Sequence, residues 1–127
     1  MTTWNDVVDH LNRHYKCEKA SADLVRLVFG FGRRTQLVLV SRGAGVSGDW
    51  VQVQSPVGDP PTKKLIDLLE DCGSKLCGAL VAMGGHVILR HSLPLATLNF
   101  GDLDWALGAI ASTADDFEEK YVGGDAY

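Results

Sequence analysis

The stretch DLVRLVFGFGRRTQLVLVSRGAGVSGDWVQVQSP, residues 23–56, decides the fold class. It contains three β-like runs, 23–32, 34–42 and 48–56, in which apolar residues alternate with others or fill consecutive positions. The runs are joined by short, glycine-rich connections, which are typical of antiparallel hairpins. We therefore expect three consecutive antiparallel strands, the middle one apolar on both faces.

Helical patterns flank these strands on both sides. The first helix is expected over residues 4–15, with Thr3 as its N-cap and Asp6 completing a weak capping box. The second helix begins at Pro60 and Pro61. The third follows the N-cap residue Asn99. The apolar residues expected to line the buried side of the second helix are Leu65, Ile66, Leu68, Leu69 and Cys72, and those of the third are Leu103, Leu107, Ile110, Ala114, Phe117 and Tyr121.

Another hairpin separates the last two helices. Gly84 and Gly85 lie between the β-like runs GALVAM and HVILRHSL, and two glycines in this position favour a two-residue turn. The predicted order is helix, three strands, helix, two strands, helix. Segregated strands with short hairpins indicate an α+β fold with an antiparallel sheet. We expect one domain over residues 1–122 and a flexible tail over 123–127.

Composition and charge exclude several classes of protein. The chain of 127 residues carries a net charge of −4 without a basic patch, which argues against nucleic acid as a partner. Its longest uncharged apolar stretch, 77–85, is far shorter than the ~20 residues of a membrane-spanning helix. The first 16 residues lack the pattern of a secretion signal. Three cysteines without CxxC spacing indicate free thiols, and we expect a cytoplasmic protein without membrane contact.

A glycine-rich segment mimics a nucleotide-binding motif. Residues 43–48, GAGVSG, match G-x-G-x-x-G directly after a β-like run. A dinucleotide site requires a helix after the third glycine, because the helix N-terminus binds the pyrophosphate. Here Gly48 is followed by the alternating run DWVQVQ and then Pro56, which predicts a strand. The segment is interpreted as a hairpin loop, and no cofactor is expected.

Polar residues suggest a weaker chemical alternative. His10, His14 and Cys17 have spacings of four and three, so a continuing helix would place them on one face, where a transition metal could bind. No HExxH glutamate accompanies them. His86 and His91, five apart on one strand, face opposite sides and do not form a shared site. The carboxylates of Asp115, Asp116, Glu118 and Glu119 are interpreted as a solvated face, with a docking surface for a basic partner as the alternative.

The third helix carries a second apolar face. Trp105 points away from the expected core stripe, beside the small residues Gly108, Ala109 and Ser112. Either the first helix packs there or another protein does, since aromatic anchors are typical of interface centres. Trp50, on the polar side of its strand, raises the same question. The candidate interface residues are Trp105, Ala109, Ser112 and Trp50.

The order of elements resembles the YbjN-like family, which is similar in fold to type III secretion chaperones. The resemblance spans about residues 4–121 and is strongest in the segment HVILRHSLPLATLNFGDLDWALGAIASTADDFEEKY, with GDWVQVQSPVG before the middle helix as a further match. It implies a non-enzymatic, often dimeric domain that binds another polypeptide along apolar grooves or a sheet edge.

These observations predict a protein-binding or chaperone-like module without catalytic residues. We expect a homodimer, with a client polypeptide as a further partner. The alternative is a small metal-binding protein or enzyme that uses His10, His14 and Cys17.

Overall fold

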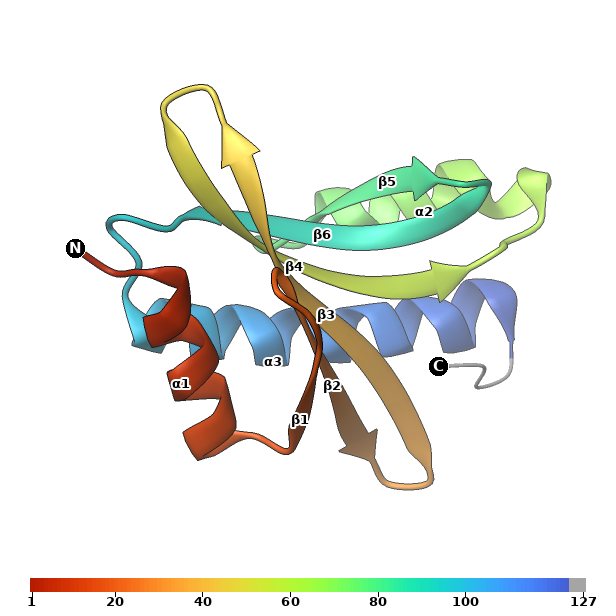
Figure 1. Cartoon of the computed structure of the whole chain (residues 1–127). Coiled ribbons are helices and arrows are strands. Elements are labelled where there is room, and N and C mark those ends of the chain that lie inside the picture. The colour runs from red at the N-terminus through yellow and green to blue at the C-terminus, as the bar shows by residue number, and fades with distance from the viewer. Residues whose placement is uncertain (124–127) are drawn as a thin grey trace.

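The computed structural model describes residues 1–123 and shows an α+β fold with a six-stranded antiparallel sheet in the order β1-β2-β3-β4-β6-β5. The helix α3 runs across the sheet, with α1 near one of its ends and α2 near the other (Figure 1). The elements are α1 (Trp4–His14), β1 (Cys17–Ser21), β2 (Leu24–Phe31), β3 (Arg34–Gly45), β4 (Gly48–Gly58), η1 (Thr62–Lys64), α2 (Leu65–Gly73), β5 (Ala79–Met83), β6 (His86–Pro94), α3 (Phe100–Phe117) and η2 (Glu118–Val122).

The predicted fold class is confirmed, and one strand is added to the predicted order. Four strands, rather than three, lie between α1 and α2, because β1 pairs with β2 at the edge of the sheet. The sequence of β1, CEKAS, contains two charged residues and no apolar alternation. An exposed edge strand buries little apolar surface, so it leaves no periodic pattern from which it could be predicted. The tail expected over 123–127 lies, from residue 124 onward, outside the described residues.

The core lies on one face of the sheet only. Alternation along the strands sends Val25 and Leu27 of β2, Val38 and Val40 of β3, and the β4 valines toward the helices, where all are buried. The helices complete this core with Leu11 of α1, Leu68 of α2 and the predicted stripe of α3. On the opposite face of the sheet, every side chain within residues 1–123 is half-buried or exposed.

Both predicted N-caps are present. The Thr3 hydroxyl accepts a hydrogen bond from the Asp6 amide, and the Asp6 carboxylate accepts one from the Thr3 amide, which completes the capping box. Asn99 Oδ1 accepts from the amides of Gly101 and Asp102 at 2.7 and 3.3 Å. These caps satisfy amides that the first turn of each helix leaves unpaired.

The chain after α3 continues as one wide turn, η2, of π-helical geometry, in which the Gly123 amide donates to the carbonyl of Glu118. This turn directs Tyr121 toward α2, where its hydroxyl donates to the Asp71 carboxylate at 2.8 Å. Lys120 Nζ also reaches Asp71, at 3.0 Å. The C-terminal end of α3 is therefore tied to α2.

No helix within the described residues is long and apolar enough to cross a membrane.

Candidate functional site

The strand β5 forms one edge of the sheet and consists only of apolar residues, ALVAM. Its hairpin to β6 turns at Gly84 and Gly85, whose φ angles of +58° and +83° fit the predicted two-residue turn. The other side of β5 faces no strand within residues 1–123. An uncovered edge exposes backbone donors and acceptors that can pair with another chain.

A groove beside β5 makes this edge more apolar. It has a volume of about 160 Å³ and is lined by residues of α2, β5 and the start of β6: Leu65, Leu68, Leu69, Leu80, Val81, Ala82 and Val87. Around it, Ile66 is 64% exposed, Leu69 52% and Met83 48%. We call this surface, consisting of the groove residues with Ile66 and Met83, the apolar edge.

The exposure of α2 corrects one expectation. Leu68 and Cys72 are buried as predicted, whereas Ile66 and Leu69 point outward into solvent. The five apolar residues of this helix cover more of its circumference than the sheet edge beneath can bury, because α2 packs at the end of the sheet rather than across it. The excess of apolar residues was visible in the sequence, but the position of α2 at an edge was not.

Trp105 lies on the outer side of α3 and is 58% exposed. Gly108 and Ser112 are exposed next to it, while Ala109 packs partly against the core. The first helix contacts α3 nearer its N-terminus, where the His10 ring stacks on Phe100 with centroids 4.4 Å apart. Trp105 is therefore not covered by the first helix, although the sequence left that arrangement open.

Trp50 is half-buried within the predicted hairpin. It pairs across the strands with Gly43, and a Cβ atom at Gly45 would lie only 2.4 Å from its ring. The indole ring thus covers a backbone without side chains, as an aromatic residue does when it compensates for a strand glycine. The G-x-G-x-x-G segment forms the end of this hairpin, because Gly45 pairs with Gly48 across the turn.

The predicted metal-ligand residues are only partly brought together. The rings of His10 and His14 lie 4.6 Å apart, but α1 ends at His14 and Cys17 begins β1. The Cys17 thiol donates to Asn12 Oδ1 at 3.2 Å. Within residues 1–123, no group of three or more histidine, cysteine or acidic side chains is arranged to hold a metal ion.

His10 instead takes part in a link between α1 and α3. Asp104 Oδ1 lies 2.7 Å from His10 Nε2 and accepts a hydrogen bond from the Tyr15 hydroxyl at 2.7 Å. Partial burial raises the pKa of Asp104, but these two partners outweigh it, so the pKa lies below its usual range. Burial and the hydrogen bond to Asp104 raise the pKa of Tyr15. The cluster therefore stabilises the packing of α1 on α3.

The four carboxylates at the end of α3 and the start of η2 divide into two pairs. Asp115 and Glu118 are buried, so the expectation of a solvated face is wrong for them. Arg34 explains the burial, since its Nε lies 3.0 Å from Asp115 and its Nη2 lies 3.2 Å from Glu118. An arginine that reaches both carboxylates reduces the cost of removing them from water. Asp116 and Glu119 remain exposed.

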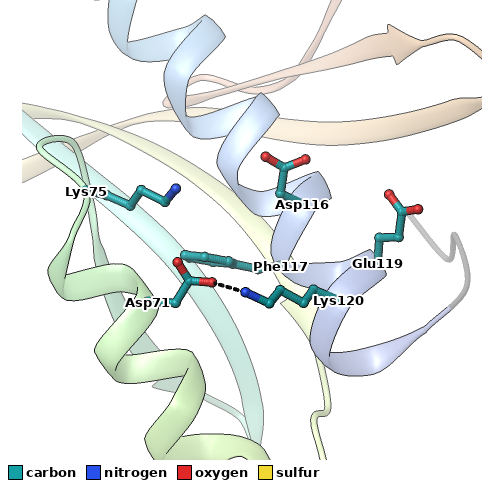
Figure 2. Close-up of a pocket in the computed structure, with 6 residues that line it drawn as sticks. All are labelled: Asp71, Lys75, Asp116, Phe117, Glu119 and Lys120. Atoms are coloured by element: carbon teal, nitrogen blue, oxygen red, sulfur yellow. Dashed lines mark hydrogen bonds and ion pairs between the residues drawn. The ribbon is translucent and has the colours of Figure 1, made fainter.

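A polar cleft of about 470 Å³ separates α2 from the end of α3 (Figure 2). Asp71 and Lys75 line one side, and Asp116, Glu119 and Lys120 line the other, with Phe117 at the base. Hydrogen bonds from Tyr121 and Lys120 hold the pKa of Asp71 below its usual range. The carboxylate of Asp71 is thus engaged in joining the two helices, and the cleft presents charges of both signs to solvent.

Comparison of the chain with protein-family models and with curated proteins finds no match.

Proposed function

We propose that this protein is a non-enzymatic protein-binding module that associates with a second copy of itself through the apolar edge. The supporting observation is the uncharged strand β5 beside the exposed leucine and isoleucine of α2. The surface favours a polypeptide because an edge strand offers hydrogen bonds to another backbone, while the groove offers burial for its side chains.

The backbone geometry of β5 specifies how the two copies would pair. A two-residue hairpin turn closes on a hydrogen-bonded pair, here Met83 and His86. Alternation then directs the backbone groups of Val81 and Ala79 toward β6 and those of Ala82 and Leu80 outward. The Leu80 backbone there is hydrogen-bonded to the Cys72 thiol of α2, a contact that a pairing strand would replace. Two β5 strands can therefore pair antiparallel about Val81, with Leu80 of one copy beside Ala82 of the other.

Self-pairing of β5 meets no electrostatic penalty. The strand contains no charged residue, so no like charges become neighbours when a two-fold axis relates the copies. The exposed side chains of Ile66 and Leu69 flank the same edge. Association would remove them from water, which supplies a hydrophobic driving force in addition to the hydrogen bonds.

The proposal agrees with what the resemblance to the YbjN-like family implies, a non-enzymatic and often dimeric domain that binds another polypeptide. The free cysteines favour the cytoplasm as its location. A metal-binding function has less support, because the Cys17 thiol is turned to Asn12, away from the two histidines. Elemental analysis of the purified protein separates the two functions, since stoichiometric zinc, nickel or iron would favour the metal site.

The experiment compares the same substitution at both edges of the sheet. Ala82 and Ala20 are both exposed alanines, the first in β5 and the second in β1. Ala82→Lys places a charge in the groove, and we expect the dissociation constant of the dimer to rise by at least about tenfold, equivalent to ~1.4 kcal/mol. Ala20→Lys should leave it unchanged. Sedimentation over a concentration series measures both, and a monomeric wild type or equal effects of the two variants would refute the proposal.

Trp105 provides a second candidate contact surface together with Ala109 and Ser112. Because Trp105 is mostly exposed, Trp105→Ala should leave the free energy of unfolding within about 0.5 kcal/mol of wild type. We expect weaker self-association or weaker capture of a partner. Unchanged sedimentation together with unchanged co-purification of partners would show that this face makes no protein contact.

A further inference from the structure

The face of the sheet opposite the helices offers a different surface, which we call the open sheet face. It belongs to a single copy of the chain and does not depend on pairing of β5. Each of its side chains in residues 1–123 is half-buried or exposed. Antiparallel sheets commonly expose one face to water, and that face is then polar. Here, however, large apolar side chains occupy part of it.

The apolar residues form one row across five strands. Val28 pairs with Leu37, Pro56 with Ile88, and Ile88 with Val81. The β3–β4 register pairs Leu39 with Gln54, and continuing it by two residues places Leu37 opposite Pro56. At about 4.8 Å per strand, this row is roughly 19 Å long. Val28 is 60% exposed at one end of it.

A second row beside it carries positive charge. Arg26 pairs with Leu39, Leu39 with Gln54, and Gln54 with Arg90. Three strand intervals separate the arginines, or roughly 14 Å. Gln54 Oε1 accepts two hydrogen bonds from the Arg90 guanidinium, each 3.1 Å long, which hold that side chain against the sheet.

The charge of these arginines is available for a partner. Across residues 1–123, Arg34 and Arg42 are the arginines in ion pairs with carboxylates, whereas Arg26 and Arg90 are not. Glu18, opposite Arg26 at the edge, is the acidic residue nearest in that row. The row from Glu18 to Arg90 thus holds two arginines and one carboxylate, an excess of one positive charge in a chain whose net charge is −4, and this excess is complementary to an acidic partner.

We propose that the open sheet face binds an acidic amphipathic helix of another protein. The apolar stripe of this helix would cover the row from Val28 to Val81, and carboxylates on one flank of the helix would reach Arg26 and Arg90. A helix fits because its backbone satisfies its own hydrogen bonds, whereas an extended segment on a fully paired sheet face would leave them unmade. With a rise of 1.5 Å per residue, carboxylates about seven or eleven residues apart lie on one side at a suitable separation.

The test uses two fluorescein-labelled peptides of about 18 residues, long enough to span the row as a helix. Both carry leucines at three- and four-residue spacing, and they differ only in glutamate or lysine at two flanking positions eleven residues apart. In fluorescence anisotropy, the wild-type protein should bind the glutamate peptide at least about tenfold more tightly than the lysine peptide. Equal binding of both peptides, or no binding of the glutamate peptide, overturns the proposal.

Charge reversal locates the binding site. Arg26→Glu/Arg90→Glu should invert the peptide preference, while Arg13→Glu/Lys63→Glu, which changes the net charge equally at exposed positions elsewhere, should preserve it. Val28→Asp, at an exposed position, should weaken binding of both peptides. Ala82→Lys should weaken the dimer but should not change peptide binding. A failure of peptide binding is therefore distinguishable from a failure of self-association through β5. An equal effect of the two double variants, or association of the copies through the open sheet face instead of peptide binding, refutes the proposal. Circular dichroism verifies that each variant is folded.

Discussion

The two edges of the sheet differ in how well they are protected against pairing with another chain. The strand β1 is short, carries Glu18 and Lys19, and has a register shift between Lys19 and Ser21. Charges and bulges are the usual means by which edge strands avoid pairing with other chains. The strand β5 is equally short but has neither charge nor bulge, and an apolar groove lies beside it. One edge is protected and the other is not, so we expect strand pairing at the sheet edges to involve β5 rather than β1.

The same contrast extends to the helices beside each edge. At the β1 end, α1 directs Trp4, Val7 and Leu11 into the core and is linked to α3 through Asp104. At the β5 end, α2 buries Leu68 and Cys72 but exposes Ile66 and Leu69. The apolar edge is therefore formed by a strand and a helix together, which makes a larger surface than either provides alone.

Removing the charges of β1 should have the largest effect on the oligomeric state, because neither edge strand then carries a charge that opposes pairing. In the wild type, pairing centred on β1 would place Lys19 beside Lys19 of a second copy, which is unfavourable. In Glu18→Val/Lys19→Val, both edges can pair, and two interfaces per chain produce open-ended assemblies. We expect light scattering to show masses that grow with concentration.

Adding Ala82→Lys to this double variant is the control, since one pairing edge then remains and growth should stop at dimers. A double variant that retains the mass of the wild type at all concentrations would show that the bulge and the shortness of β1 protect it without the charges.

Neighbouring leucines of α2 should separate stability from association. Leu68 is 1% exposed, so Leu68→Ala should lower the free energy of unfolding by about 2–5 kcal/mol. Leu69 is largely exposed, so Leu69→Ala should change it by no more than about 0.5 kcal/mol while weakening the dimer. Urea unfolding and sedimentation measure the two quantities. A comparable loss of stability in both variants would contradict the proposed role of Leu69 in the apolar edge.

The smallest expected effect is a pH dependence of the attachment of α2. The pKa of Asp71 is lowered in the folded chain by hydrogen bonds from Tyr121 and Lys120. Its contribution to stability is therefore complete above the usual value of 3.8 and is lost as the pH falls through the lower folded pKa. Unfolding curves between neutral and acidic pH should converge for wild type and Asp71→Asn. Curves that remain equally separated at the acidic end would show that this carboxylate does not titrate with folding.

Much of the fold follows from local sequence patterns, whereas the surfaces depend on how the elements are placed. The strands β2 to β6, both N-caps and the buried stripe of α3 were predictable because alternation, glycine turns and helical spacing act over a few residues. The strand β1 was not, since its pairing with β2 stabilises a sequence without apolar periodicity. The burial of Asp115 and Glu118 depends on Arg34, which lies 81 and 84 residues away in the chain.

The candidate surfaces show the same limit. Trp105 was predicted from its position opposite the core stripe, and the structure leaves it exposed. The apolar edge and the open sheet face were missed, because the sequence does not show that β5 is the last strand or that all three helices pack on one face. Both facts come from the strand order and from the long-range contacts of the helices.

The wide turn η2 has a consequence for changes in chain length. It inserts one residue more per hydrogen-bonded turn than the helix before it, and this extra residue aims Tyr121 at Asp71. Deleting any one of Glu118, Glu119 and Lys120 would rotate Tyr121 by about 100° around the helix axis and detach the C-terminal anchor of α2. Descendants of this sequence should therefore tolerate substitutions in this turn more readily than insertions or deletions, although the turn lies about forty residues after the β5 edge whose shape it maintains.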